Sequence, residues 1–322
     1  MSYELRTGET FGRGARRSCR REIARAIEWS QRPADGELSP VHQTRKHLKK
    51  ARAALRLLSP VVGEKKFASM EKKLKKVAKL LSEMRDAEVR FHTVRQLMAT
   101  FHLEKDHVLD ETETLLGFEL ESFLAASGDW QGEVAQRLRR LRIRIGDWNT
   151  EELNCKQVRW VVQQTYDNGV QALREALDRP TAENFHIFRK AAKELTYQLC
   201  LLAPIDRPFL EPHVEALKIL SEHLGNAHDL AFLGERLRKL ETGAEERSTA
   251  RAFFELIGLR EKELQLRAAT LAEKFYAERV TDFGKRISRR LAGWEEQQAG
   301  TISLAQKNPR FAGAMNGQYP TS

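Results

Sequence analysis

The chain has 322 residues, of which 41% are hydrophobic and 31% are charged, and its net charge at pH 7 is +10. This length and composition predict a globular chain with a buried core. No run approaches the ~18–20 apolar residues of a membrane helix, and the three cysteines lie far apart, which argues against a disulfide framework and a CxxC-type metal site.

Helical periodicity runs through nearly the whole chain, and the strict alternation typical of strands is essentially absent. In the first half, apolar residues recur at steps of three and four. They predict helices over approximately residues 11–30, 40–59, 67–84, 89 onward into an acidic region, and 106–124. Pro40 suits the first turn of the second of these helices, and the Ser59-Pro60 pair ends it.

The sequence Gly146-Asp147-Trp148-Asn149 breaks this pattern, and a second half then repeats the same order of helices. These helices are predicted over approximately residues 153–177, from 186 onward, around 217–224, and over 248–278 and 282–298. The short loops between helices argue for antiparallel bundles. Residues 299–322 are rich in Gly, Asn, Pro and Ser and are expected to form a flexible C-terminal tail.

One basic pattern occurs twice, at a constant offset of 144 residues and without gaps. Each copy begins with a histidine (His42 or His186) and runs through a Leu-rich stretch to a proline (Pro60 or Pro204). On a helical wheel, the histidine and the cations of each copy lie on one side, and the leucines and alanines lie on the other. The basic sides consist of His42, Arg45, Lys46, Lys49 and Arg56 in the first copy, and of His186, Arg189, Lys190 and Lys193 in the second.

Like charges at such spacing cost a helix about 0.2–0.5 kcal/mol per pair. A single basic helix is most simply interpreted as a solvated lysine face. A repeated, histidine-led cationic face without carboxylates between the cations instead favours a surface that binds a polyanion. If the two halves are related by an approximate twofold axis, the two histidine-led helices are expected to lie near each other.

The positive charge is concentrated in one region. Residues 42–79 contain thirteen Lys and Arg against two Glu, a net charge of +11, so the rest of the chain sums to −1. Such a concentration is typical of a protein that attracts anions. The further candidate anion-binding residues in this region are Lys50, Arg52, Lys72, Lys76 and Lys79. The sequence leaves open whether the lysine-rich helix, residues 65–79, lines the same site or an outer face.

A second element follows each copy of the basic pattern: Arg85-Asp86 in the first half and His228-Asp229 in the second. Arg85 and His228 fall on the apolar side of their predicted helices, where a charge is costly unless a negative group meets it. Two interpretations stand, pairing with a carboxylate such as the neighbouring Asp, or contact with an anionic ligand.

The two HxxR(K/R)xxK copies, their Leu-rich continuation to a proline and the later (R/H)D step resemble the CHAD domain (conserved histidine α-helical domain) family, from about residue 3 to 294. The resemblance implies an all-α fold of two pseudo-twofold-related four-helix bundles, produced by internal duplication, with a basic cavity between or along them. It also implies a single domain over residues 3–298, with halves of approximately 10–147 and 153–298.

The resemblance further implies binding of inorganic polyphosphate. Carried over by position, the binding residues are His42, Arg45, Lys46, Lys49, Arg56, Arg85, His186, Arg189, Lys190, Lys193 and His228. The second copy departs from the first at Glu194, Thr196 and Cys200, which stand where the first has Lys50, Arg52 and Arg56. The first half is therefore predicted to be the stronger anion surface, and the cavity to be electrostatically lopsided.

We predict a non-enzymatic, cytoplasmic polyphosphate-binding domain with no cofactor and no metal, and with polyphosphate granules and granule proteins as further candidate partners. The motifs HExxH, GxxxxGK[ST], GxSxG and ExExK are absent from the sequence. The N-terminal sequence lacks the apolar run of a secretory signal, and no membrane partner is expected. Histidines beside phosphates are expected to make binding tighter at pH 6 than at pH 8.

Two other functions stay open. The basic region 42–79 could bind nucleic acid, but few aromatic residues lie between its cations, so nucleic acid is not expected as the specific ligand. A scaffold that docks to an acidic protein partner would use the same basic surface. Competition between polyphosphate and mixed-sequence DNA would distinguish these functions.

Overall fold

The computed structural model describes residues 3–33, 38–102, 107–238 and 247–307, and within these ranges the chain is helical, with no strand. The all-α prediction is therefore confirmed. The helices are α1 (Phe11–Ser30), α2 (Pro40–Leu57), α3 (Ser59–Val62), α4 (Glu64–Leu80), α5 (Ser82–Phe101), α6 (His107–Ala126), α7 (Trp130–Gly146), α8 (Cys155–Asp178), α9 (Ala182–Leu202), α10 (Arg207–Arg238), α11 (Arg247–Phe275) and α12 (Val280–Lys307). A short 3₁₀ turn, Ala203–Ile205, joins α9 to α10.

The two histidine-led helices, α2 and α9, begin with hydroxyl caps. The side chain of Ser39 accepts a hydrogen bond from the backbone N–H of His42, and that of Thr181 accepts one from the N–H of Asn184. Each cap satisfies one of the N–H groups that have no partner inside the helix. Pro40 occupies the first turn of α2, as predicted. The caps therefore fix where each basic face starts.

The structure corrects the helix predicted over residues 67–84. Helix α4 ends at Leu80, α5 begins at Ser82, and Leu81 lies between them with φ −96° and ψ 5°. The hydroxyl of Ser82 donates to the carbonyl oxygen of Lys79 at 2.6 Å, which satisfies one of the free carbonyls at the end of α4. Because Leu81 stays fully buried, the apolar series continues across the break, and periodicity alone cannot reveal it.

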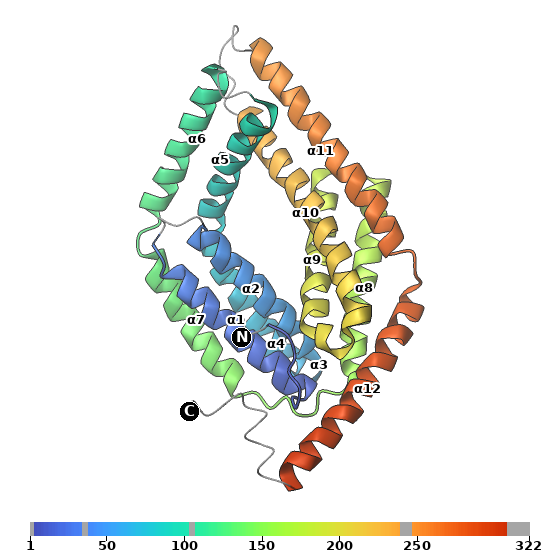
Figure 1. The fold of residues 1–322 in the computed structure, drawn as a ribbon. Coiled ribbons are helices and arrows are strands. Elements are labelled where there is room, and N and C mark those ends of the chain that lie inside the picture. Colours follow the sequence, from blue (N-terminus) through green and yellow to red (C-terminus); the bar gives the residue numbers. More distant parts are fainter. Residues whose placement is uncertain (1–2, 34–37, 103–106, 239–246, 308–322) are drawn as a thin grey trace, which may run out of the picture.

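Three helix pairings of the first half have counterparts in the second half. In the first half α1 packs against α2 and α7, and α4 packs against both α2 and α7. In the second half α8 packs against α9 and α12, and α10 packs against α9. Figure 1 shows these two sets side by side, and α2 packs against α9 where they meet. The internal duplication and its twofold relation stay predictions.

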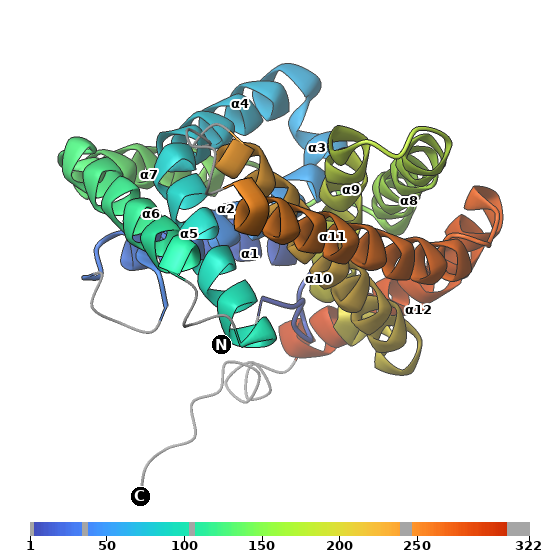
Figure 2. The same ribbon diagram turned by 90° about the horizontal axis from the view of Figure 1, so that it is seen from above.

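Two separate apolar cores hold this arrangement together. The larger one joins both halves and includes Leu48 and Leu55 on α2 and Leu195 on α9, each 0–1% exposed. The smaller one lies between two helix pairs, α5 with α6 and α10 with α11, and includes Val94 and Leu233. Figure 2 shows α5 beside α6, and α11 running along α10. The break at Leu81 allows α5 to leave the larger core and enter the smaller one.

The last helix is longer than predicted. Helix α12 continues to Lys307, through residues 299–307, which were assigned to a flexible tail. Gly300 lies within this helix. A glycine inside a helix costs about 1 kcal/mol relative to alanine, which is too little to end a long helix by itself. Residues 308–322 of the predicted tail lie outside the described residues. None of the described helices is sufficiently long and apolar to span a membrane.

Candidate anion-binding site

The packing of α2 against α9 brings the two copies of the basic pattern together. Ten of the predicted residues form a connected set in which each interacts electrostatically with at least one other, and we call them the cationic cluster. They are His42, Arg45, Lys46, Lys49, Arg85, His186, Arg189, Lys190, Lys193 and His228. The cluster draws its members from four helices, α2, α5, α9 and α10. The expectation that the two histidine-led helices lie near each other is therefore confirmed.

Two histidines of the cluster form a stacked pair. The rings of His186 and His228 are nearly parallel, at 26°, with their centroids 4.2 Å apart. The pKa of each ring is lowered to about 4, first by burial and then by neighbouring groups that include Lys190 and Arg189. The pKa of His42 on α2 is lowered to about 4 too, first by burial and then by cations such as Arg85. All three rings are therefore neutral at pH 7.

The two central lysines are also perturbed. The pKa of Lys49 is lowered to about 7, first by burial and then by Arg189 and Arg45. The pKa of Lys193 falls to about 8, first through burial and then through Arg189. Both lysines are therefore surrounded by protein and lie close to other cations. Adding negative charge at this position would favour their protonated forms.

An aspartate faces the motif arginine in each half. Asp86 is the largest charged influence on Arg45, and Asp229 is the largest charged influence on Arg189. Burial raises the pKa of both aspartates, while these arginines oppose the rise. From the sequence, the cation of each (R/H)D step is predicted to bind the anion, and the aspartate is not assigned to the site. The recurrence of an aspartate at the same step in both halves was the sequence signal that could have identified this residue.

Arg85 pairs with a carboxylate within the protein. Its Nη1 lies 3.3 Å from Oε2 of Glu88, and the other carboxylate oxygen of Glu88 accepts the hydroxyl of Ser39 at 2.6 Å. Arg45 donates from Nη1 to the carbonyl oxygen of Ala78, at 2.5 Å. These contacts tie the start of α2 to α4 and α5. Thus a nearby carboxylate does meet Arg85, as one of the two interpretations held, and Arg85 is still part of the cationic cluster.

Comparison with known proteins identifies the fold family. The sequence model for the CHAD domain matches residues 17–238, which include most of α1 and all of α2 to α10. The chain belongs to the CHAD domain family. Two solved structures share the fold: the CHAD domain from the plant Ricinus communis (18% identity, TM-score 0.54, 87% of this chain and 94% of that one) and PptA from Streptomyces chartreusis (16%, 0.55, 85% and 100%). The search of curated proteins gave no match.

Two predicted arginines of this CHAD domain lie in an ion-pair network outside the cluster. Arg52 and Arg56 bind Glu71 of α4, at 3.3 and 2.9 Å, and Arg56 also binds Glu194 of α9. Glu194 is the residue that replaces, in the second copy, the lysine at position 50. The departure between the two copies therefore places a carboxylate where it neutralises a cation of the first copy.

The other predicted lysines of the CHAD domain lie at the edge of the cluster or apart from it. Lys50 interacts with Lys46 at the edge of the cluster, and its Nζ lies over the ring of Tyr3, 5.2 Å from the ring centre. On α4, Lys72 and Lys79 are exposed, and Lys76 lines a groove shared with α7. The lysine-rich helix thus uses part of its basic surface on a second face of the protein. Among the described residues, no group of three or more His, Cys, Asp or Glu could hold a metal ion.

Proposed function

We propose that this CHAD domain binds inorganic polyphosphate through the cationic cluster, without catalysing a reaction. The observation that carries the proposal is the suppressed ionisation of Lys49 and Lys193, whose pKa values fall to about 7 and about 8. Burial is the main cause of these low pKa values, and repulsion from neighbouring cations such as Arg189 adds to it. A polyanion placed among them relieves this repulsion, so part of the binding free energy comes from restoring their charge.

The surroundings of Lys49 support a concave site. Lys49 is exposed to solvent, yet burial is the largest cause of its low pKa. Both facts hold for a side chain that water reaches but protein surrounds, as at the floor of a hollow. Two buried nitrogen atoms of the cluster, Nδ1 of His186 and Nε of Arg189, have no hydrogen-bond partner among the described residues. We propose this hollow as the basic cavity implied by the family.

The chemistry of the cluster suits phosphates without bases. Polyphosphate offers about one negative charge per unit, and arginine can bind two of its oxygens at once. Hydrogen bonds to charged groups contribute roughly 1.5–3 kcal/mol each, so a few of these cations would suffice for tight binding. We propose the protein as a cytoplasmic receptor that long chains recruit to polyphosphate granules. Arg52 and Arg56 are assigned a structural role, because carboxylates already bind them.

Competition tests this proposal against nucleic-acid binding and against docking to an acidic protein. The purified protein would be titrated with long-chain polyphosphate at near-physiological salt, with mixed-sequence DNA at equal phosphate concentration as the competitor. We expect polyphosphate to bind and DNA not to displace it. Equal displacement by DNA would identify a general cationic surface. Absence of polyphosphate binding would direct attention to a protein partner.

A further inference from the structure

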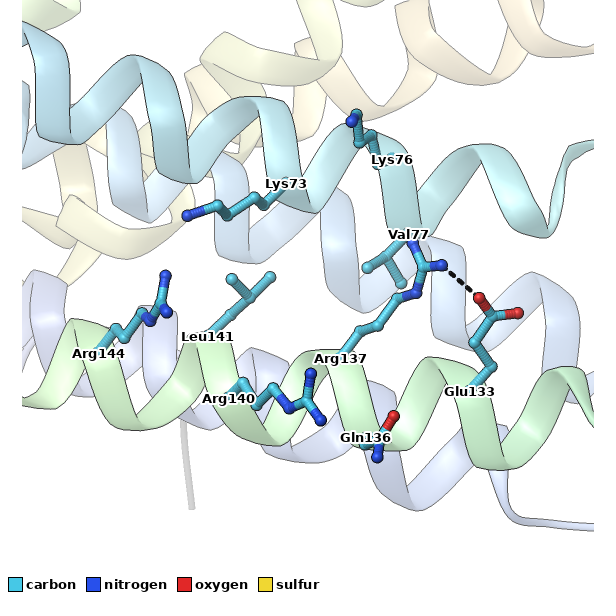
Figure 3. Close-up of a pocket in the computed structure, with 9 residues that line it drawn as sticks. All are labelled: Lys73, Lys76, Val77, Glu133, Gln136, Arg137, Arg140, Leu141 and Arg144. Carbon is cyan, nitrogen blue, oxygen red and sulfur yellow. Dashed lines mark hydrogen bonds and ion pairs between the residues drawn. The ribbon is translucent and has the colours of Figure 1, made fainter.

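A second basic groove lies between α4 and α7, away from the cationic cluster. Its volume is about 450 Å³, and buried Val77 and Leu141 form its apolar floor. Figure 3 shows cations along both of its walls. They are Lys73 and Lys76 on α4, and Arg137, Arg140 and Arg144 on α7.

Positive charge in this groove is almost uncompensated. Glu133 is the one carboxylate among its lining residues, and it already pairs with Arg137 (Figure 3). Lys73, Lys76, Arg140 and Arg144 form no ion pair or side-chain hydrogen bond with any described residue. Elsewhere on α4 the situation differs, since Glu71 compensates the two arginines of α2. The groove therefore retains four free cations around an apolar floor.

The groove and the cationic cluster lie on different sides of α4. Ala78 faces α2, where its carbonyl oxygen binds Arg45 of the cluster. Lys73 and Lys76 face α7 instead. The fully buried Leu74 separates the two sides, and the exposed Lys72 and Lys79 lie on the solvent side of the same helix. No residue of the groove belongs to the cluster.

We propose that the α4–α7 groove is a second binding site for a polyphosphate chain, an inference that rests on the function proposed above. Arg137, Arg140 and Arg144 follow one face of α7 over about 10 Å, at 1.5 Å of rise per residue. A linear chain lying along the groove meets these arginines on one wall and the two lysines of α4 on the other. The apolar floor strengthens such charged contacts because it limits the access of water.

The lining residues also discriminate between phosphate polymers. No aromatic side chain lines the groove, so the bases of a nucleic acid would find no ring on which to stack. A bare phosphate chain needs only cations. With two sites on one domain, a long chain that reaches both binds the second intramolecularly, which raises its overall affinity without any new contact. The exposed lysines of α4 supply positive charge along that path.

Isothermal titration with tripolyphosphate, which is too short to bridge two sites, tests the groove directly. We expect two equivalents to bind the wild-type protein and one to bind Arg140→Gln/Arg144→Gln. The matched control is Arg139→Gln/Arg142→Gln, two exposed arginines of the same helix that do not line the groove, and it should still bind two. Lys73→Gln/Lys76→Gln, on the opposite wall, should repeat the loss. Thermal unfolding would verify that each variant is folded.

The outcomes separate the groove from the cluster. If Arg140→Gln/Arg144→Gln and its control bind the same number of equivalents, the proposal of a groove site would be overturned, because the position of the arginines on α7 would then make no difference. One wild-type equivalent, lost only in Lys49→Ala/Lys193→Ala, would overturn the groove and leave the cluster in place. One equivalent lost only in the groove variants would retain the groove and reject the cluster. Displacement of the second equivalent by DNA at equal phosphate concentration would overturn its assignment to polyphosphate.

Discussion

His186 on α9 and His228 on α10 stack with their ring centroids 4.2 Å apart, inside a ring of cations. Two imidazolium rings this close would repel each other, and the pKa of about 4 for each ring keeps the pair neutral. The two rings are therefore stacked and neutral when no anion is bound. An anion bound beside it would favour protonation, so the pair couples anion binding to proton binding.

Polyphosphate binding should take up protons. A bound polyanion raises the pKa of Lys49 and Lys193, which are about 7 and about 8 in the free protein, and of His42, His186 and His228, which are about 4. The complex then holds more protons than the free protein, so affinity rises as pH falls, and binding is tighter at pH 6 than at pH 8. Calorimetry in buffers of different ionisation enthalpy measures the uptake. An enthalpy that is independent of the buffer would contradict it.

The free protein should lose stability in mild acid because of the same histidines. Their pKa is about 4 in the folded chain and 6.5 when unperturbed, so the unfolded chain binds more protons between these values. Stability therefore falls as pH decreases from 6.5 to 4. Urea unfolding across this range should show a flatter decline in His42→Gln/His186→Gln/His228→Gln. An unchanged slope in that variant would show that the histidines are not the cause.

Glu194 should weaken anion binding, because it places a negative charge next to Lys193 of the cluster while it pairs with Arg56 of α2. Glu194→Gln removes that charge, and Arg56 keeps its other partner, Glu71. A partly exposed pair of this kind is worth up to about 1 kcal/mol, so polyphosphate affinity should rise by up to about fivefold. Titration of Glu194→Gln beside Glu296→Gln, an exposed position on α12, measures the difference. Weaker binding in Glu194→Gln would contradict the assignment.

His47 has a structural role, although it lies on the same helix as His42. Its Nδ1 lies 2.6 Å from Oε2 of Glu22 on α1, and the Glu22 side chain is fully buried. Glu22→Ala leaves the buried ring of His47 without its hydrogen-bond partner, which should destabilise the fold by about 2–3 kcal/mol. Urea unfolding measures the loss, with the exposed Glu28→Ala as control. Polyphosphate affinity of the folded variant should be unchanged. A loss of affinity equal to that of a cluster variant would make His47 part of the site.

The basic faces of α2 and α9 could be predicted from the sequence because helical periodicity is a local property. The leucines of α2 and α9 form the buried side of each helix, and the spacing places His42 and His186 on the opposite side. The duplicated pattern also indicated that the two faces should meet. Those predictions required only spacing and repetition.

Other features depend on contacts between distant segments. The pairing of Arg56 with Glu194 joins residues from different halves, and neither its geometry nor its effect follows from either helix alone. The break at Leu81 is invisible because the buried series continues across it. The groove required α7, whose arginines were not connected with the lysines of α4 before the two helices were seen to pack.

The most direct test of the cationic cluster compares the loss of two lysines inside it with the loss of two lysines outside it. Lys49→Ala/Lys193→Ala removes two lysines of the cluster, and Lys65→Ala/Lys66→Ala removes two exposed lysines of α4 that lie outside both proposed sites. Titration with long-chain polyphosphate at near-physiological salt measures both. We predict a loss of at least about 2 kcal/mol, roughly thirtyfold in affinity, in the cluster variant and little change in the other. Equal losses in the two variants would contradict a specific site at the cluster.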